Sequence, residues 1–218
     1  MLNFFLDLLL SVPAFLIAIS VHEYAHGYAA YKMGDPTAKY SGRLSLNPLA
    51  HFDLVGGLCL LLFHFGWAKP VPVNPNNFKD RKKGNIIVSL AGPVSNFVMA
   101  IISAFLYAIT VKVLKTDMYH LTMNELVGFK VLIPIFYNCI MLNVGLMIFN
   151  LIPVPPLDGS KILFEFLPYK GKQVMYNMER YSFLILILVI YSGLLDPALA
   201  YLQMGVLRFI NFVLGIFF

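Results

Sequence analysis

The segment His22-Glu-Tyr-Ala-His26 places two metal ligands and a base within little more than one helical turn. Residues four positions apart lie on the same face of a helix, so the imidazoles of His22 and His26 can bind one metal ion. Glu23 follows the first ligand, where its carboxylate can take a proton from a water on that metal. His and Glu are unfavourable inside an apolar helix and indicate a functional site there. The pattern is typical of a zinc hydrolase, here in surroundings where water is scarce.

The composition indicates that these residues lie in a membrane. Of the 218 residues, 59% are hydrophobic and 12% are charged, with a mean hydropathy of +0.76, whereas soluble domains carry about 25% charged residues. The net charge of +5 does not indicate nucleic acid, because the basic residues stand in the connections between apolar runs, as they do in membrane proteins. We expect a single membrane-embedded domain formed by residues 1–218.

Apolar stretches that can form membrane helices recur along the chain, at residues 2–33, 85–113, 126–152, 181–195 and 198–218. The stretch 181–195 is marginal in length. Within the 35–84 connection, the apolar run 54–67 is too short for a span and is typical of a re-entrant or interfacial segment. The expected fold is an α-helical multi-pass membrane protein, with a core at about 1–165 and two C-terminal helices at about 181–218.

The distribution of basic residues favours a re-entrant 54–67 segment. If this segment does not cross, twelve Lys and Arg share one side against three on the other; if it crosses, the division is nine against six. The basic side is then cytosolic, and the N-terminus lies outside. Nine residues separate Tyr24 from Met33, which is about 14 Å of helix. We therefore expect a metal within the bilayer, nearer the cytosolic face. The twelve are Lys32, Lys39, Arg43, Lys69, Lys79, Arg81, Lys82, Lys83, Lys161, Lys170, Lys172 and Arg180, and the three are Lys112, Lys115 and Lys130.

A catalytic zinc ion takes three protein ligands and keeps one position open, so a third ligand is needed. Asp158 is the candidate, in the segment Asn-Leu-Ile-Pro-Val-Pro-Pro-Leu-Asp-Gly at 150–159. The prolines prevent the preceding helix from continuing and deliver the carboxylate at the cytosolic end of a span. Spacing alone leaves two interpretations open. Asp158 is either a metal ligand, or it makes a turn with Gly159 or caps a short helix.

Several further motifs accompany the His-Glu segment, namely Asn47-Pro-Leu-Ala-His51, Gly66-Trp-Ala-Lys-Pro-Val-Pro-Val-Asn74, Ala91-Gly-Pro-Val-Ser-Asn96 and the Pro-Pro-Leu-Asp-Gly run. In this order, over roughly residues 15–165, they resemble the site-2 protease family of intramembrane zinc metalloproteases. The chain is similar to the short prokaryotic branch of that family, which has no PDZ or CBS domain. An integral protein of a prokaryotic cell membrane is therefore expected.

The resemblance implies one zinc ion held by His22, His26 and Asp158, with Glu23 as the catalytic base. It also implies a three-helix catalytic core, formed by the helices at 2–33, 85–113 and 126–152. The 35–84 connection would contribute β-strands and a membrane-inserted piece.

Three more polar residues are candidates for binding substrate. His51 follows Asn47-Pro48 and either reaches the cleft or makes a structural hydrogen bond. Asn96 lies early in its span, where its amide can bind a substrate backbone or a neighbouring helix. The same alternatives hold for Asn150.

The reaction that these residues favour is hydrolysis of a peptide bond in a membrane-spanning protein substrate. The substrate helix must unwind locally before attack, and an edge strand of the 35–84 connection can hold it by strand addition. One alternative is a catalytically silent zinc-binding scaffold or chaperone, against which the intact Glu23 argues. Another is a transporter with an intramembrane metal, for which inverted repeats are expected; the sequence has none.

Overall fold

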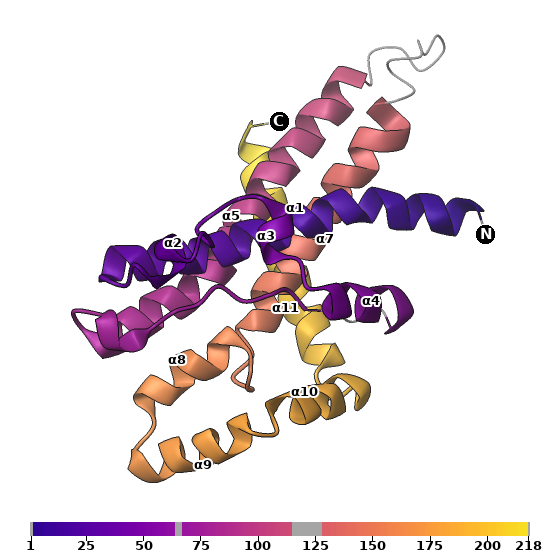
Figure 1. Ribbon diagram of the computed structural model, residues 1–218. Helices are drawn as coiled ribbons and strands as arrows, with labels where there is room; N and C mark the ends of the chain where they lie inside the picture. The colour runs from indigo at the N-terminus through magenta and orange to yellow at the C-terminus, as the bar shows by residue number, and fades with distance from the viewer. Residues whose placement is uncertain (1, 64–66, 115–127, 218) are drawn as a thin grey trace.

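The computed structural model describes residues 2–63, 67–114 and 128–217, and it confirms an α-helical fold with membrane-length helices (Figure 1). Three described helices are long and apolar enough to cross a membrane, at Arg81–Val113, Lys130–Asn150 and Asp196–Phe217. The helices are α1 (Leu2–Met33), α2 (Thr37–Tyr40), α3 (Pro48–His51), α4 (Leu54–Phe63), α5 (Arg81–Leu114), α7 (Ile133–Asn150), α8 (Asp158–Phe166), α9 (Tyr169–Glu179), α10 (Ser182–Tyr191) and α11 (Asp196–Phe217), with a 3-10 turn at Pro75–Asn77 and a π-helical turn at Gly128–Leu132.

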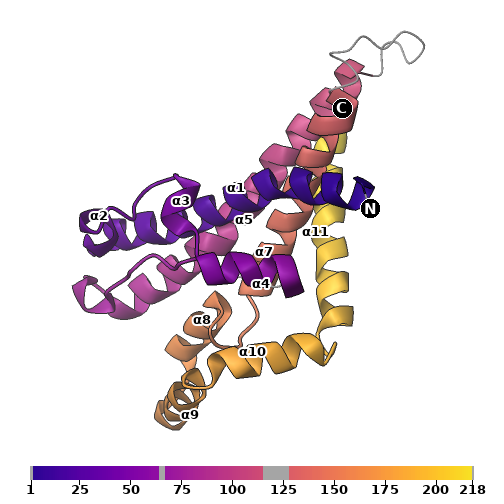
Figure 2. The same ribbon diagram turned by 45° about the vertical axis from the view of Figure 1, so that its right-hand side comes forward.

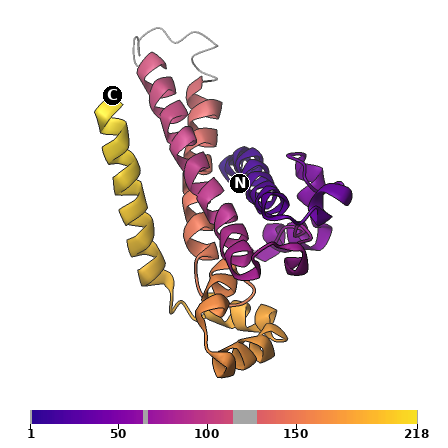
Figure 3. The ribbon, with the colours of Figure 1, turned by 90° about the vertical axis from the view of Figure 1, so that its left-hand side faces the viewer.

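An antiparallel pair, α5 and α7, forms the centre of the molecule. Asn96 Nδ2 donates to Asn143 Oδ1 at 2.8 Å, and farther along α5 Ser103 hydrogen-bonds the thiol of Cys139. Ala100 and Ala104 are buried in the apolar cluster that joins these helices to α11, since small residues let helix backbones approach closely in a membrane. Figure 3 shows α1 on one side of this pair and α11 on the other.

The C-terminal helix α11 runs parallel to α5. The ring centroids of Phe97 and Phe209 lie 6.0 Å apart, and those of Phe105 and Phe217 lie 5.3 Å apart. From the first pair to the second, the residue number increases along α5 and along α11 alike, so the two helices run in the same direction. The chain must therefore begin α11 at the same end of the molecule at which α5 begins.

This direction corrects the expectation that the stretch 181–195 forms a span. Its helix α10 has only ten residues, about 15 Å in length, and it is bent by 83° from α9. Roughly twenty residues are needed to cross a bilayer. Helix α10 therefore does not cross, and the chain stays on the side at which α7 ends until α11 begins there and crosses.

The two ends of the 54–67 segment lie close together, while its re-entry into the membrane stays a prediction. The Lys69 N–H donates to the His51 carbonyl at 2.9 Å, which joins the two ends of the segment. Gly56 lies so close to the returning chain that a Cβ atom there would be 2.1 Å from the Trp67 carbonyl oxygen. Beyond this point Trp67 packs edge-on against Phe183 of α10, with ring centroids 5.3 Å apart; Figure 2 shows α4 and α10 on the same side of the bundle.

The expected β-strands of the 35–84 connection are wrong, since the described residues of this connection form no strand. Residues 67–74 run without regular secondary structure, and Pro70 and Pro72 have no N–H to donate to a ladder. The Val71 N–H between them donates to the Glu23 carboxylate at 2.8 Å. The backbone N–H groups of this segment thus bind individual side chains, such as Glu23 of α1, rather than a neighbouring strand.

Asp35 anchors this connection just beyond the end of α1. Its side chain is fully buried, and its carboxylate accepts hydrogen bonds from the N–H groups of Thr37 at 3.1 Å and Asn74 at 2.7 Å, and from Asn77 Nδ2 at 2.7 Å. Burial alone would raise the pKa of Asp35, but these hydrogen bonds outweigh it and hold the pKa below its ordinary value.

We expect Asp35→Asn to lower the melting temperature of the purified protein at pH 7 by several degrees. The charged acceptor is lost, and such hydrogen bonds contribute about 1.5–3 kcal/mol. Because the folded pKa is depressed, the carboxylate stabilises the protein fully above the unfolded pKa of about 3.9. This contribution is lost as the pH falls through the lower folded value, so the difference between wild type and variant should shrink there. A difference that is constant from pH 7 to pH 3 would contradict this account.

The direction of α11 predicts the side on which the chain ends. In a background without Cys59 and Cys139, single cysteines replacing Lys82 and Lys172 should react alike with a membrane-impermeant thiol reagent. A cysteine replacing Phe217 should react from the opposite side, because α11 crosses and α10 does not. Labelling of Phe217→Cys together with Lys172→Cys would show that α10 spans the membrane, and would overturn this arrangement.

Candidate metal centre

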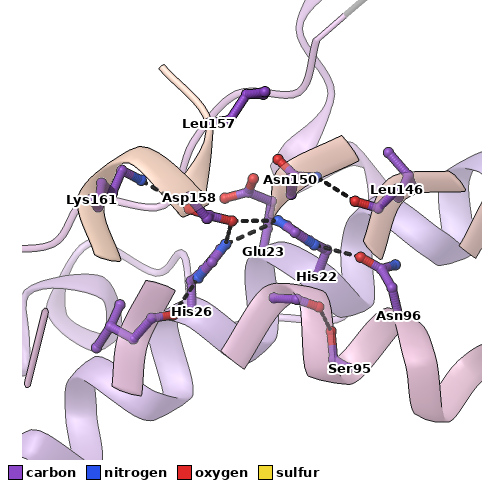
Figure 4. Close-up of polar contacts among 12 residues, drawn as sticks. His22, Glu23, His26, Ser95, Asn96, Leu146, Asn150, Leu157, Asp158 and Lys161 are labelled. Atoms are coloured by element: carbon purple, nitrogen blue, oxygen red, sulfur yellow. Dashed lines mark hydrogen bonds and ion pairs between the residues drawn. The ribbon is translucent and has the colours of Figure 1, made fainter. Parts of the chain in front are cut away.

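His22, His26 and Asp158 converge on one point, although the carboxylate is more than a hundred residues from the histidines (Figure 4). The Nε2 atoms of the two histidines are 2.9 Å apart, and they lie 3.3 Å and 3.0 Å from Asp158 Oδ2. All three residues are buried. Ligand atoms placed 2.0–2.1 Å from a tetrahedral zinc ion would be separated by about 3.3 Å. The observed separations fit this size of ion.

The outer nitrogens of both histidines fix which nitrogen faces the cluster. His26 Nδ1 lies 2.7 Å from the Val88 carbonyl oxygen, and His22 Nδ1 lies 2.5 Å from Asn96 Oδ1. Both partners accept hydrogen bonds, so in the neutral imidazoles each Nδ1 carries the proton and each Nε2 carries a lone pair. Metal-binding histidines are commonly oriented in this way. Two lone pairs and a carboxylate oxygen thus face one another, and a cation is what such a donor set requires.

Asn96 connects this arrangement to all three core helices. Its Nδ2 donates to the Ala18 carbonyl of α1 and to Asn143 Oδ1 of α7, while its Oδ1 faces His22. Asn143 Nδ2 in turn donates to the Cys139 carbonyl at 2.8 Å. The side-chain amide of Asn96, which is fully buried, is therefore committed within the protein and orients His22. Substrate binding by Asn96 stays a prediction.

Gly92 of α5 provides the space in which the ligands meet. A Cβ atom at this position would lie 2.4 Å from His26 Nε2 and 2.5 Å from His22 Cε1. Glycine inside a helix is unfavourable by about 1 kcal/mol relative to alanine, and here it is required for the close approach of the helix to both rings. Any larger residue would collide with both imidazole rings.

Asp158 is the first residue of α8, and the short segment after α7 holds it in place. Gly159 packs against the end of α7 so closely that a Cβ atom would be 2.2 Å from the Leu151 carbonyl oxygen. Lys161 Nζ lies 3.1 Å from Asp158 Oδ1, on the carboxylate oxygen that faces away from the histidines. Asp158 begins α8 but does not cap it, because the N-cap is Leu157, and its Oδ2 atom faces both histidines. Its role as a metal ligand stays a prediction.

Glu23 lies beside the cluster, with its carboxylate oriented by the backbone of the 67–74 segment. Its Oε2 atom accepts the Val71 N–H at 2.8 Å, and Figure 4 shows the carboxylate next to His22 and Asp158. A single neutral N–H restrains this group without neutralising it. The arrangement fits a base that works on a molecule bound at the metal.

The other two candidates for substrate binding are His51 and Asn150, and neither belongs to the three clustered ligands. His51 is buried in α3, where its Nε2 makes a hydrogen bond of 2.7 Å to the Ser45 carbonyl, so it is not a member of the ligand cluster. Asn150 ends α7 near the cluster, and its Nδ2 donates to the Leu146 carbonyl at 3.0 Å. Substrate binding by these two residues stays a prediction.

Sequence reasoning gave no role to Gly92, although it quoted the motif that contains this residue, and it missed Asn143 and Lys161 as parts of the site. A glycine and an asparagine inside apolar helices are signals that could have drawn attention to the first two. The contact of Lys161 follows from its position three residues after Asp158 on a helix.

Comparisons with known proteins agree with this geometry. The profile of peptidase family M50 matches residues 11–192. The chain is 39% identical over 184 residues to the Bacillus subtilis protein named "Putative zinc metalloprotease YwhC", which covers 84% of this chain and 80% of that protein. It is 28% identical over 197 residues to "Putative zinc metalloprotease Rip2" of Mycolicibacterium smegmatis, covering 88% of this chain and 68% of that protein. No solved structure matches the chain significantly.

The family match covers most of the chain, and the three clustered side chains form a donor set suited to the metal that the relatives' names specify. The membrane-length helices put this site in an integral membrane protein. The chain belongs to peptidase family M50, the site-2 protease family, and is a membrane-embedded zinc metalloendopeptidase.

Proposed function

We propose that the enzyme hydrolyses peptide bonds in membrane-spanning protein substrates, with one zinc ion held by His22, His26 and Asp158 and with Glu23 as the general base. The observation that carries this proposal is the position of the Glu23 carboxylate beside three converging ligand atoms. Those atoms come from α1 and α8 and meet against α5, a helix that is long and apolar enough to cross a membrane. The substrate is therefore a protein that is itself in the bilayer.

The residues around the ion have distinct tasks in this mechanism. When bound, zinc lowers the pKa of a water ligand towards about 7 and polarises the scissile carbonyl. Glu23 takes a proton from the attacking water and gives it to the leaving amine. The Val71 N–H holds Glu23 Oε2 and leaves Oε1 to receive the proton. Asn96 and Val88 keep the protons of His22 and His26 on Nδ1, so that both Nε2 atoms remain ligands.

The substrate must present an extended segment, since the carbonyls of an intact helix are satisfied within the helix. The described part of the 35–84 connection offers no strand to which a substrate could add. The 67–74 segment, which passes Glu23, is instead the element placed to line an unwound substrate. Asn150 lies near the same position, and its amide is a second contact for the substrate backbone.

The site lies nearer one end of the helices, and we propose that this end faces the cytosol of a bacterium. His26 is level with Val88, which is seven residues into α5, or about 10 Å from its start. The connections at this end carry the twelve basic residues, in accordance with the positive-inside rule. Products are then released towards the cytosol.

Replacing Glu23 distinguishes a protease from a catalytically silent zinc-binding scaffold, which would use the same ligands but not the base. If Glu23 is the general base, Glu23→Gln should lower the cleavage rate by about 100-fold or more, while zinc stays bound. The assay combines the purified enzyme with single-span bacterial membrane proteins in liposomes, and mass spectrometry detects the products. Glu179→Gln, at an exposed position on α9, is the matched control and should cleave normally. Wild-type cleavage by Glu23→Gln would refute the assigned mechanism.

The close approach of α5 predicts that Gly92→Ala removes zinc. The added methyl group would meet His22 and His26 at less than 3 Å, so the rings must move out of their ligand positions. Gly145→Ala is the matched control in the neighbouring helix α7, because a Cβ atom there meets nothing within 4 Å. Metal analysis should find zinc in Gly145→Ala and a large loss in Gly92→Ala. Equal zinc content in the two variants would contradict the position assigned to the ion.

A further inference from the structure

Helix α11 carries an arginine near its middle. Arg208 lies twelve residues after Asp196, which begins the helix, and nine residues before Phe217, which ends it. These separations correspond to about 18 Å and 14 Å of helix, in a helix that is long and apolar enough to cross a membrane. Charged residues are rare inside a bilayer, and those that occur there indicate a function and a partner.

Packing within the bundle places Arg208 at the level of the metal centre. Its neighbour Phe209 packs against Phe97 of α5, with ring centroids 6.0 Å apart. Phe97 follows Asn96, whose Oδ1 atom lies beside His22 Nδ1. The arginine and the histidine are thus at similar depths, on opposite sides of the α5–α7 pair (Figure 3). Arg208 therefore lies within the membrane-spanning part of the bundle rather than at its end.

The side chain of Arg208 lies on the face of α11 that points away from the protein. The residues of α11 that contribute to the buried apolar cluster include Val206, Leu207, Ile210 and Leu214. Arg208 is two positions from Ile210, or about 200° around the helix axis, and it is exposed. Only 6% of the apolar stretch of α11 is buried, compared with 22% in α5 and in α7. The described chain therefore leaves this face uncovered.

The guanidinium also finds no opposite charge within the chain. Arg208 takes part in none of the ion pairs among the described residues. Its Nη2 atom lies 3.2 Å from Met204 Sδ, and a thioether is only a weak acceptor. Met204 is one turn nearer the start of α11, so the side chain is directed away from the nearer end of the helix. It does not extend towards the closer membrane surface, as long basic side chains near helix ends do.

The residues around Arg208 leave room for another helix. The outer face of α11 consists of Gly205, Arg208, Asn211, Phe212 and Gly215, at three, four and seven positions from the arginine. A Cβ atom at Gly205 or at Gly215 would meet nothing within 4 Å, and Asn211 is exposed. Small residues let membrane helices approach closely, and amide side chains hydrogen-bond across helices.

We propose that the outer face of α11 binds a membrane helix of a partner protein, which supplies an Asp or Glu carboxylate to Arg208 inside the bilayer. The charge selects the partner, because a guanidinium presents two parallel N–H groups to a carboxylate and either charge alone is unfavourable in lipid. The partner is not a substrate held for cleavage, since α5 and α7 separate this face from the histidines of α1 (Figure 3). It is an accessory subunit.

A second copy of the chain does not meet this requirement. All copies have the same orientation in the membrane, so two α11 helices related by a two-fold axis place Arg208 against Arg208, and like charges repel. The three membrane-length helices contain one acidic residue among them, Asp196 at the first position of α11. The carboxylate is therefore assigned to a different protein.

The test measures how designed membrane helices bind the full-length protein in phosphatidylcholine liposomes at pH 7. The protein carries a donor dye on Lys172→Cys, in a background without Cys59 and Cys139. Each probe is a single-span leucine–alanine peptide with an acceptor dye and one central polar residue, either aspartate or the isosteric, uncharged asparagine. Energy transfer reports binding. No peptidase activity enters the readout, so the outcome is independent of the proposed function.

The wild-type chain should bind the aspartate helix about tenfold more tightly than the asparagine helix, as expected of a strong polar contact between membrane helices. Arg208→Leu should abolish this preference, whereas Arg208→Lys, which keeps the charge, should retain part of it. Arg180→Leu is the matched control, because this arginine is exposed just after α9, and it should behave as wild type. A zinc content equal to that of wild type would show that Arg208→Leu is folded.

Equal binding of the two helices by the wild-type chain would overturn the proposal, and so would an aspartate preference that persists in Arg208→Leu. Energy transfer between two differently labelled copies of the chain that requires Arg208, in place of the aspartate preference, would also overturn it, since a second copy would then occupy this face. The wild-type comparison decides the question even if one variant does not fold.

Discussion

The convergence of two imidazole lone pairs and one carboxylate oxygen is the interaction on which the rest of the structure depends. The three atoms lie within about 3.3 Å of one another in a buried site, and a carboxylate in such surroundings requires a compensating charge. Lys161 contacts only the outer oxygen of Asp158. A cation at the centre satisfies all three ligand atoms at once, and the contacts of the two Nδ1 atoms with Asn96 and Val88 turn both Nε2 atoms towards it.

Each of the core helices contributes to this arrangement in a different way. Helix α1 carries the histidines and Glu23, while α5 supplies Asn96 and the Val88 carbonyl that orient the rings, and Gly92 that leaves room between them. Helix α7 anchors Asn96 through Asn143 and delivers α8, which begins at Asp158. The chain after the 54–67 segment returns to the same place, where Val71 contacts Glu23. The long helices thus position the site residues, and each of these residues is then oriented by only one or two hydrogen bonds.

The sequence was a good guide where function constrains residue types. Polar residues in an apolar chain are few, so the His-Glu motif could be selected without a structure, and the family resemblance added the distant Asp158. The structure brings the three side chains together. It was a poor guide to backbone arrangement. Proline positions in 67–74 remove donors that a strand needs, and the contacts of Phe97 and Phe105 with α11 set its direction. The hydrogen bond of His51 Nε2 to the Ser45 carbonyl, six residues earlier, also depends on a backbone conformation that the sequence pattern does not encode.

Zinc K-edge X-ray absorption of the purified wild-type protein and of Asp158→Ala tests the central claim most directly. The account predicts one zinc ion per chain with nitrogen and oxygen ligands at about 2.0–2.2 Å, two of them imidazoles. It also predicts reduced zinc content and a changed ligand shell in Asp158→Ala. Sulfur ligands at about 2.3 Å, which would implicate Cys59 or Cys139, would contradict the account. An unchanged ligand shell and zinc content in Asp158→Ala would contradict it equally.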